Sequence, residues 1–462
     1  MPAIITKDFR IQNANQFKES FDESADTYYL AIGRPQAFAN DQAFNDGTDT
    51  SPPTPVDSVG SVDYYVYDDL MSAKKITSSN VSAVIPRRNW TTGTTYDYYR
   101  HDYGEINSAG SAIAANSGAT TLHDATFYVM NSTFDVYKCI DNNGDSASTV
   151  EPTGNKTTSV FSTGDSYKWK YMYTLTASEQ ANFMSTDFIH CSTESTDYST
   201  TAGAIEHAKV TAGGSSGTNG TYTNVDIRGD GSSGKCTVVV SSNAVTSVTI
   251  TTAGSGYTFA SVLASDIGTV SGADIDFIIS PPGGHATDVI AELGGFFVMM
   301  NVDFATDESG EFNTSNDFRR IALLRNPTDS TTGATATAST LDATKSITFS
   351  GTPGTFQADE KITQASTGAV GYVVDFNSTT KVLRYIQPQF ANQGIDTNQN
   401  VTAFSGTNTV TGGTSSATGT PSSHDVTPEL TADTGDILYI ENRKPISRAS
   451  DQTENVKLIV EF

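Results

Sequence analysis

The sequence predicts a mainly β fold with a few short helices, arranged as a β-sandwich-like core with two inserted small β modules. Short runs of β-branched and aromatic residues recur along the chain, separated by turns rich in Gly, Thr, Ser, Asn and Asp. Tyr (20), Phe (23) and Gly (38) are abundant, which is typical of many short strands. At 462 residues the chain is too long for one ordinary core, so several domains are expected.

Residues 1–90 are predicted to form the first part of the core domain. Apolar residues recur at helical spacing in Ile11–Phe21 and in Val62–Ala73, which predicts a helix in each. Thr27–Gly33 is a predicted strand that Arg34-Pro35 ends, and Val81–Ile85 is predicted to run extended into Pro86.

Residues 91–202 are predicted to form a second β domain. Its expected strands are Thr126–Met130, Phe134–Ile140 and Tyr167–Leu175. In the last of these, aromatic residues alternate with lysines, which predicts a strand with one aromatic face. A short helix is expected to follow, ending near Phe183.

Residues 203–283 are predicted to form the first inserted β module. Gly217–Val225 and Gly254–Val262 resemble two copies of one turn-plus-strand motif. The segment between them, CTVVVSSNAVTSVTITT, predicts a β-hairpin. Residues 284–326 then continue the core domain with a helical turn and two strongly apolar strands.

Residues 327–424 are predicted to form the second, Thr/Gly-rich inserted β module. Short strands at a spacing of about 8–12 residues predict a small barrel or sandwich. The edges of this module, Asp329–Ser339 and Gly406–Ser423, are expected to be flexible because of their Thr, Ser and Gly content.

Residues 425–462 are predicted to supply the C-terminal strands of the core domain. Ile437–Ile440 and Val456–Phe462 have strand patterns, and the second alternates apolar and charged residues. A basic turn built on Arg443, Lys444 and Pro445 is expected between them.

Charge and composition limit the partners of the chain. A net charge of −25 disfavours nucleic acid, which requires a basic face, and disfavours anionic membranes. No run of about 18 apolar residues is present to span a membrane. The three cysteines are widely spaced and form no CxxC pair, and the sequence MPAIITKDFR lacks the pattern of a signal peptide. Synthesis and folding in a cytoplasm are therefore expected.

The sequence predicts no catalytic, cofactor-binding or metal-binding residues. Gly229–Cys236 (GDGSSGKC) approaches a phosphate-binding loop, but a strand-like TVVV follows it instead of a helix. Asp141–Ser146 (DNNGDS) resembles the start of a calcium loop, but its glycine is misplaced. The six histidines show no zinc-ligand spacing and no GxSxG motif is present, so an enzyme is not expected.

Seven segments resemble, in the same order, the baseplate wedge protein family of T-even-like contractile-tailed phages, the products of gene eight. They are AIITKDFR, YYLAIGRPQAF, AVIPRRNW, VYKCID, GDSYKWKYMYTL, DFRRIALLRNP and the block GDILYIENRKPISRASDQTENVKLIVEF. The resemblance covers residues 1–200, 290–326 and 428–462. It implies a structural, non-enzymatic virion protein of the tail baseplate, assembled in the host cytoplasm. It also implies a homodimer that joins other wedge proteins around the tail hub.

Arginine is concentrated in the segments that carry the resemblance. Nine of the twelve arginines lie in residues 1–90, 296–326 and 435–462. The guanidinium group suits two-point pairing with carboxylates, either within the fold or across a subunit interface, and both alternatives stay open. The candidate interface or core-network residues are Arg87, Arg88, Trp90, Arg319, Arg320, Arg443 and Arg448.

A second function remains an alternative, namely a peripheral tail adhesin that binds a host surface carbohydrate or receptor. The Thr/Gly-rich modules and the Tyr-rich segment Tyr96–Tyr103 (YDYYRHDY) suggest it, since tyrosines suit both sugar-stacking surfaces and wet protein interfaces. Host-surface contact would then occur through the inserted modules.

Overall fold

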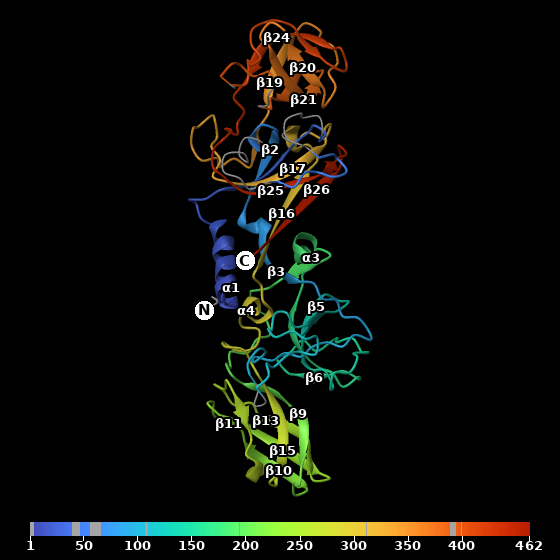
Figure 1. The fold of residues 1–462 in the computed structure, drawn as a ribbon, viewed down its shortest axis with the longest axis vertical. Coiled ribbons are helices and arrows are strands. Elements are labelled where there is room, and N and C mark those ends of the chain that lie inside the picture. Colours follow the sequence, from blue (N-terminus) through green and yellow to red (C-terminus); the bar gives the residue numbers. More distant parts are fainter. Residues whose placement is uncertain are drawn as a thin grey trace. The chain divides into compact units, whose positions relative to one another are not determined.

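The computed structural model describes residues 4–38, 47–55, 66–106, 110–193, 195–310, 312–388, 394–398 and 400–462. The mainly β fold with several sheets is confirmed (Figure 1). The chain divides into two compact units. Unit 1 comprises residues 1–16, 82–299 and 459–462, and unit 2 comprises residues 17–81 and 300–458. The six-part division of the chain into core and inserted segments stays a prediction.

Unit 1 contains a central sheet with the strand order β4-β5-β7-β6. The bounds of these strands are β4 Tyr128–Met130, β5 Asp135–Asp141, β6 Phe161–Ser162 and β7 Lys168–Thr174. Both faces of the sheet are buried, because Val136 and Met172 belong to one apolar cluster whereas Tyr137 and Trp169 belong to another. The residues of the predicted aromatic face are divided between the two clusters, since Tyr171 belongs to the second and Tyr173 to the first.

Helix α3 (Ala177–Phe183) follows β7, as predicted. It begins at a capping box, because the Glu179 N–H donates to the Thr176 hydroxyl at 3.3 Å and the Thr176 N–H donates to the Glu179 carboxylate at 2.7 Å. The remaining elements of this part of unit 1 are β3 (Val81–Pro86), β8 (Phe188–His190) and α4 (Val289–Leu293).

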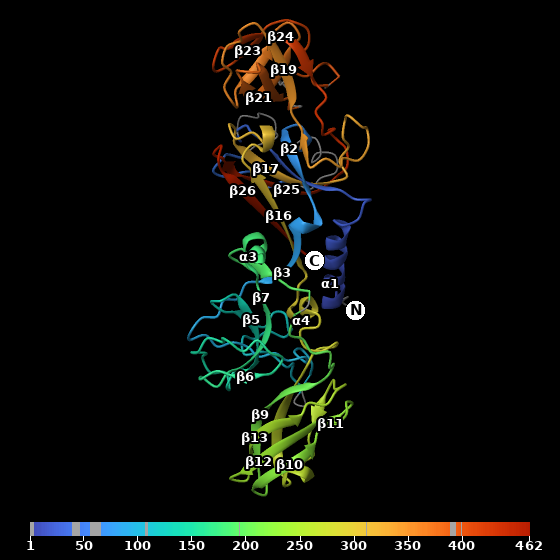
Figure 2. The same cartoon turned by 180° about the vertical axis from the view of Figure 1, so that it is seen from behind.

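Residues 203–283, which we call the module, form a separate small body in unit 1 (Figures 1 and 2). Strands β10, β12 and β13 form one sheet, and β9 pairs with β15. The bounds are β9 Ile205–Ser215, β10 Gly220–Asp226, β11 Arg228–Gly229, β12 Lys235–Ser241, β13 Ala244–Thr252, β14 Ala260–Ser261 and β15 Ser271–Ile279, with a 3₁₀ turn at Ala264–Ile267. The predicted hairpin is confirmed as β12–β13, and its turn residues Ser242 and Asn243 have φ of 51° and 68°.

The prediction of two equivalent turn-plus-strand motifs in the module is wrong. Gly217–Val225 forms most of β10, but Gly254–Val262 contains only the two-residue strand β14. The reason is Tyr257, which is buried and packs directly against Gly231, where a Cβ atom would lie 2.4 Å from the tyrosine ring. The glycines of the phosphate-loop-like segment therefore make room for a tyrosine.

Unit 2 contains a five-stranded antiparallel sheet with the order β18-β2-β1-β17-β25. The bounds are β1 Tyr28–Gly33, β2 Leu70–Ile76, β17 Phe318–Arg325, β18 Thr340–Asp342 and β25 Asp436–Ile446. Two predictions need correction here. Val66 and Tyr67 of the predicted helix Val62–Ala73 are helical, but residues 70–73 lie in β2, where pairing with β1 and β18 overrides the local spacing; residues 62–65 lie outside the described residues. The predicted basic turn at Arg443–Pro445 is part of β25, which continues to Ile446 through a register shift.

Unit 2 also contains the predicted small barrel, closed in the order β19-β22-β21-β20-β23-β24 (orange to red in Figure 2). The bounds are β19 Lys345–Ser350, β20 Lys361–Gln364, β21 Ala369–Asn377, β22 Val382–Ile386, β23 Val410–Gly412 and β24 Thr418–Asp425. The expectation of a flexible edge at Gly406–Ser423 is wrong, because β23 and most of β24 lie there. The Glu360 carboxylate holds their turn by accepting from the Thr414 and Ser415 N–H groups at 3.0 and 2.8 Å.

Four elements contain the points at which the chain passes between the units. One is β3, whose first residue, Val81, belongs to unit 2. The others are α1 (Lys7–Ser20), which matches the predicted first helix, β16 (Phe297–Ala305) and β26 (Thr453–Glu461). Short 3₁₀ turns occur at Ser78–Asn80 and Glu308–Gly310. Among the helices of the described ranges, none is long and apolar enough to cross a membrane.

Candidate functional site

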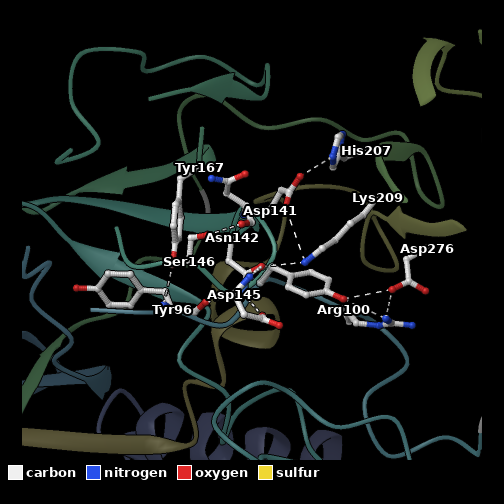
Figure 3. Close-up of polar contacts among 12 residues, drawn as sticks. Tyr96, Arg100, Asp141, Asn142, Asp145, Ser146, Tyr167, His207, Lys209 and Asp276 are labelled. Atoms are coloured by element: carbon white, nitrogen blue, oxygen red, sulfur yellow. Dashed lines mark hydrogen bonds and ion pairs between the residues drawn. The ribbon is translucent and has the colours of Figure 1, made fainter. Parts of the chain in front are cut away.

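Charged and polar side chains of the central sheet region and of the module meet within unit 1 at a contact that we call the seam. Figure 3 shows its part around Asp141 and Arg100. Strand β9 supplies three of them and β15 supplies one, while β5, β7 and the segment before β4 supply the opposite side. The seam residues are Tyr98, Arg100, Lys138, Asp141, Asn142, Lys170, Glu206, His207, Lys209 and Asp276.

Glu206 is the most deeply buried acid of the seam and faces two lysines. The Lys170 ammonium lies 2.9 Å and the Lys138 ammonium 3.3 Å from its carboxylate oxygens. Lys138 is also 2.6 Å from Glu292, so two acids and two bases balance each other. Burial alone would raise the pKa of Glu206, but Lys138 and Lys170 lower it more strongly, to about 2.

In the central part of the seam, the two sides exchange the kind of group that they supply. The acid, Asp141, belongs to β5, and the module supplies the basic side chains. His207 Nε2 lies 3.0 Å from one carboxylate oxygen of Asp141, and Lys209 Nζ lies 3.8 Å from the other. Lys209 also donates to the Asn142 side chain at 2.8 Å and lies 3.9 Å from the centre of the Tyr98 ring. Burial opposes ionisation of Asp141, yet the His207 hydrogen bond keeps its pKa below the usual value.

The third part of the seam joins Arg100 to Asp276 of β15. The Tyr98 hydroxyl donates to the same carboxylate at 3.2 Å. Arg100 is held in place by Asp102, which accepts two hydrogen bonds of 2.8 Å from its guanidinium group. Each charge of the seam thus faces an opposite charge across it. The arrangement holds two bodies in one register, and it presents no activated nucleophile.

The candidate residues Arg87, Arg88 and Trp90 all lie in unit 1 and are half-buried. Arg87 donates to the Ser185 carbonyl at 2.9 Å, and Arg88 donates to the carbonyls of Ala125 and His123. The Trp90 indole N–H donates to the Ser148 hydroxyl at 3.0 Å.

Four candidate residues lie in unit 2, and three of them are buried. Arg319 forms a two-point pair with Asp49 at 3.0 and 3.1 Å, and Arg320 lies 2.7 Å from Asp69. Arg448 donates to the carbonyls of Phe304, Thr306 and Phe312. Arg443 is different, because its side chain is 49% exposed while it pairs with Glu441 at 3.1 Å.

The sequence reasoning missed the seam. The available signal was Lys138 within VYKCID, a lysine flanked by residues that a buried strand would carry. Such a lysine is rarely buried without an acidic partner. The Tyr-rich segment Tyr96–Tyr103 is not an open stacking surface, since Tyr96 and Tyr99 are buried. Within the described ranges, no group of three or more His, Cys, Asp or Glu side chains is arranged to hold a metal ion.

Fold and seam together define a multidomain β protein in which charged groups join the module to the central sheet region within unit 1. Residues 3–150 match the protein family described as Bacteriophage T4, Gp8. The chain is 26% identical to the baseplate wedge protein gp8 of Enterobacteria phage T4 over 215 residues. This alignment covers 40% of this chain and 60% of the T4 protein. The match thus spans less than two thirds of the T4 protein. The predicted resemblance to the gene-eight baseplate wedge proteins is confirmed.

Proposed function

We propose that this chain is a structural, non-enzymatic subunit of a phage tail baseplate wedge. The observation that carries the proposal is the match of residues 3–150 to the Gp8 family, together with the similarity to the T4 baseplate wedge protein. The chain would be assembled in a host cytoplasm and reside in the virion tail. It would form a homodimer and position neighbouring wedge proteins around the tail hub.

The structure supports a mechanical role for this subunit. A scaffold protein works by keeping its surfaces at fixed distances, which requires stiff bodies and specific internal contacts. The buried ion pair Arg320–Asp69 of unit 2 favours one arrangement of the strands that carry it, because any other arrangement within the unit leaves a buried charge unpaired. The closed barrel has no free sheet edge along its ring of strands.

We place Arg443 at a subunit interface. Its exposed guanidinium lies on β25, in a segment that resembles the wedge family, whereas Arg319, Arg320 and Arg448 use their donors inside unit 2. Exposed apolar side chains also occur on the same strand at Leu438 and Tyr439, which are 44% and 37% exposed. Arginine and apolar residues together are typical of protein interfaces.

The solution mass tests the proposal. Light scattering on a sizing column should give twice the chain mass of 49.0 kDa, and Arg443→Glu should weaken the dimer. Arg228→Glu is the matched control, because Arg228 is a similarly exposed, ion-paired arginine outside the segments that carry the resemblance. A stable trimer would count against the wedge assignment. A dimer equally strong in both variants would remove Arg443 from the interface.

The adhesin alternative is supported by one feature of unit 2. A polar cavity of about 460 Å³ lies between the loop after β16 and the barrel, lined by side chains that include Asn313, Asp375, Asn377 and Arg384. Planar polar side chains of this kind suit a hydroxyl-rich ligand. This function predicts that particles lacking residues 327–424 assemble but do not adsorb to host cells. Failure of assembly would favour the wedge role.

A further inference from the structure

The module has its own apolar core, which is nearly separate from that of the central sheet. Fourteen buried residues between Ile205 and Ile279 form the module core, and none comes from outside the module. The cluster that covers one face of the central sheet contains only Ile278 from the module. Apolar packing therefore fixes the module at one point beside its exit strand, while the rest of the contact is the charged seam.

The chain enters and leaves the module through a narrow neck formed by residues 199–204 and 280–285. The two connections lie side by side, since the Ser280 N–H donates to the Ala204 carbonyl at 2.8 Å and the Ser199 N–H donates to the His285 carbonyl at 2.9 Å. Gly284 has φ of 99°, and a Cβ atom there would lie 1.9 Å from the Ser199 oxygen. Two adjacent connecting segments that contain a glycine at positive φ are suited to act as a hinge.

The seam combines specificity with reversibility. Buried ions lose hydration when the module docks, and the Coulomb attraction of each pair roughly offsets this loss. When the module leaves, Glu206 regains water and Lys138 keeps Glu292 of α4 as a partner, so opening costs less than the number of contacts suggests. The balance changes if one acid is neutralised while the module stays docked. Lys138 and Lys170 are 0% and 7% exposed, so both would then lack a carboxylate of the module.

We propose that the module is a hinged arm, that the neck is its hinge, and that the seam is an electrostatic latch whose central residue is Glu206. Neutralising Glu206 releases the arm as an intact body, with the central sheet and the module core still folded. The proposal concerns the isolated chain and does not depend on the baseplate role. It gives the subunit two arrangements of the same folded parts, selected by the charge balance of the seam.

The test is a distance measurement between two spin labels in the full-length chain. Ser178 of α3 and Ser265 of the module are exposed and can be replaced by cysteine, while the native Cys139, Cys191 and Cys236 are buried and should not react. In the wild-type background we expect one narrow distance distribution. Glu206→Gln should add a second, longer population with an unchanged far-UV circular dichroism spectrum.

Asp226→Asn is the matched control. It neutralises an acid of the same module that pairs with exposed Lys235 away from the seam, so its distances should equal those of the wild type. If Glu206→Gln fails to fold, Asp276→Asn at the less buried end of the seam decides the question. A single wild-type distance in the folded seam variant would overturn the latch, and so would an equal change in the Asp226→Asn control.

Discussion

Asp69 is predicted to be essential for the stability of unit 2. Its side chain is 2% exposed and lies between two buried arginines, 2.7 Å from Arg320 and 3.7 Å from Arg34. Asp69→Asn preserves size but leaves both guanidinium groups without their carboxylate. Breaking a buried ion pair in this way costs about 3–5 kcal/mol. With a urea dependence of about 2–3 kcal/mol per M, the unfolding midpoint should fall by about 1–2.5 M.

The assay uses the positions of the two tryptophans. Trp90 and Trp169 both lie in unit 1, so their fluorescence reports the unfolding of that unit, whereas circular dichroism reports both units. Asp69→Asn should therefore lower the circular dichroism transition of unit 2 and leave the fluorescence transition in place. Asp436→Asn, which breaks an exposed pair with Arg325 in the same unit, should cost less than about 1 kcal/mol. Equal urea midpoints for the two variants would show that the buried Asp69 contributes no more to the stability of unit 2 than the exposed Asp436.

Three further predictions concern single side chains. Burial lowers the pKa of His123 to about 4, so the unfolded chain binds more protons than the folded chain between pH 4 and about 6.5. The free energy of unfolding of unit 1 should therefore decrease by about 3 kcal/mol as the pH falls through this window. In His123→Asn the free energy of unfolding of unit 1, followed by tryptophan fluorescence, should depend less steeply on pH. An unchanged slope would contradict this prediction. Glu360→Gln should cost about 1–3 kcal/mol and speed hydrogen exchange at Thr414 and Ser415, because their amides lose a charged acceptor. Hydrogen exchange at Thr414 and Ser415 as slow as in the wild type would count against this role of Glu360. Arg448→Lys should lower the free energy of unfolding of unit 2 by a similar amount, because an ammonium group cannot reproduce the planar guanidinium that donates to three carbonyls. The urea midpoint of unit 2 measures this loss.

Local sequence patterns predicted the elements whose causes are local. The alternation in Tyr167–Leu175 predicted β7, and the run after it begins with the Thr176–Glu179 capping pair that starts α3. The hairpin β12–β13 is likewise adjacent in sequence. In each case the residues that decide the structure lie within a few positions of one another.

Elements that depend on distant partners were predicted wrongly or not at all. β2 forms a strand because β1 and β18 pair with it, although its own apolar spacing suits a helix. β25 continues through Pro445 because β17 provides its pairing partner. The seam needs Glu206 to meet Lys138 from 68 positions away, and no local pattern carries that information.

The register of β1 with β17 has a consequence for how the protein is made. Tyr28 pairs with Arg325, 297 residues later (325 minus 28), and β17 in turn pairs with β25. β2 follows β1 closely and pairs with its other edge. At a synthesis rate of about 5–20 residues per second, the edge of β1 that pairs with β17 waits about 15–60 s on the ribosome. Residues 82–299 of unit 1 are continuous and emerge during that wait. Newly made chains should therefore complete the central sheet region first and expose the unpaired edge of β1 meanwhile, which makes this strand the point most vulnerable to aggregation during translation.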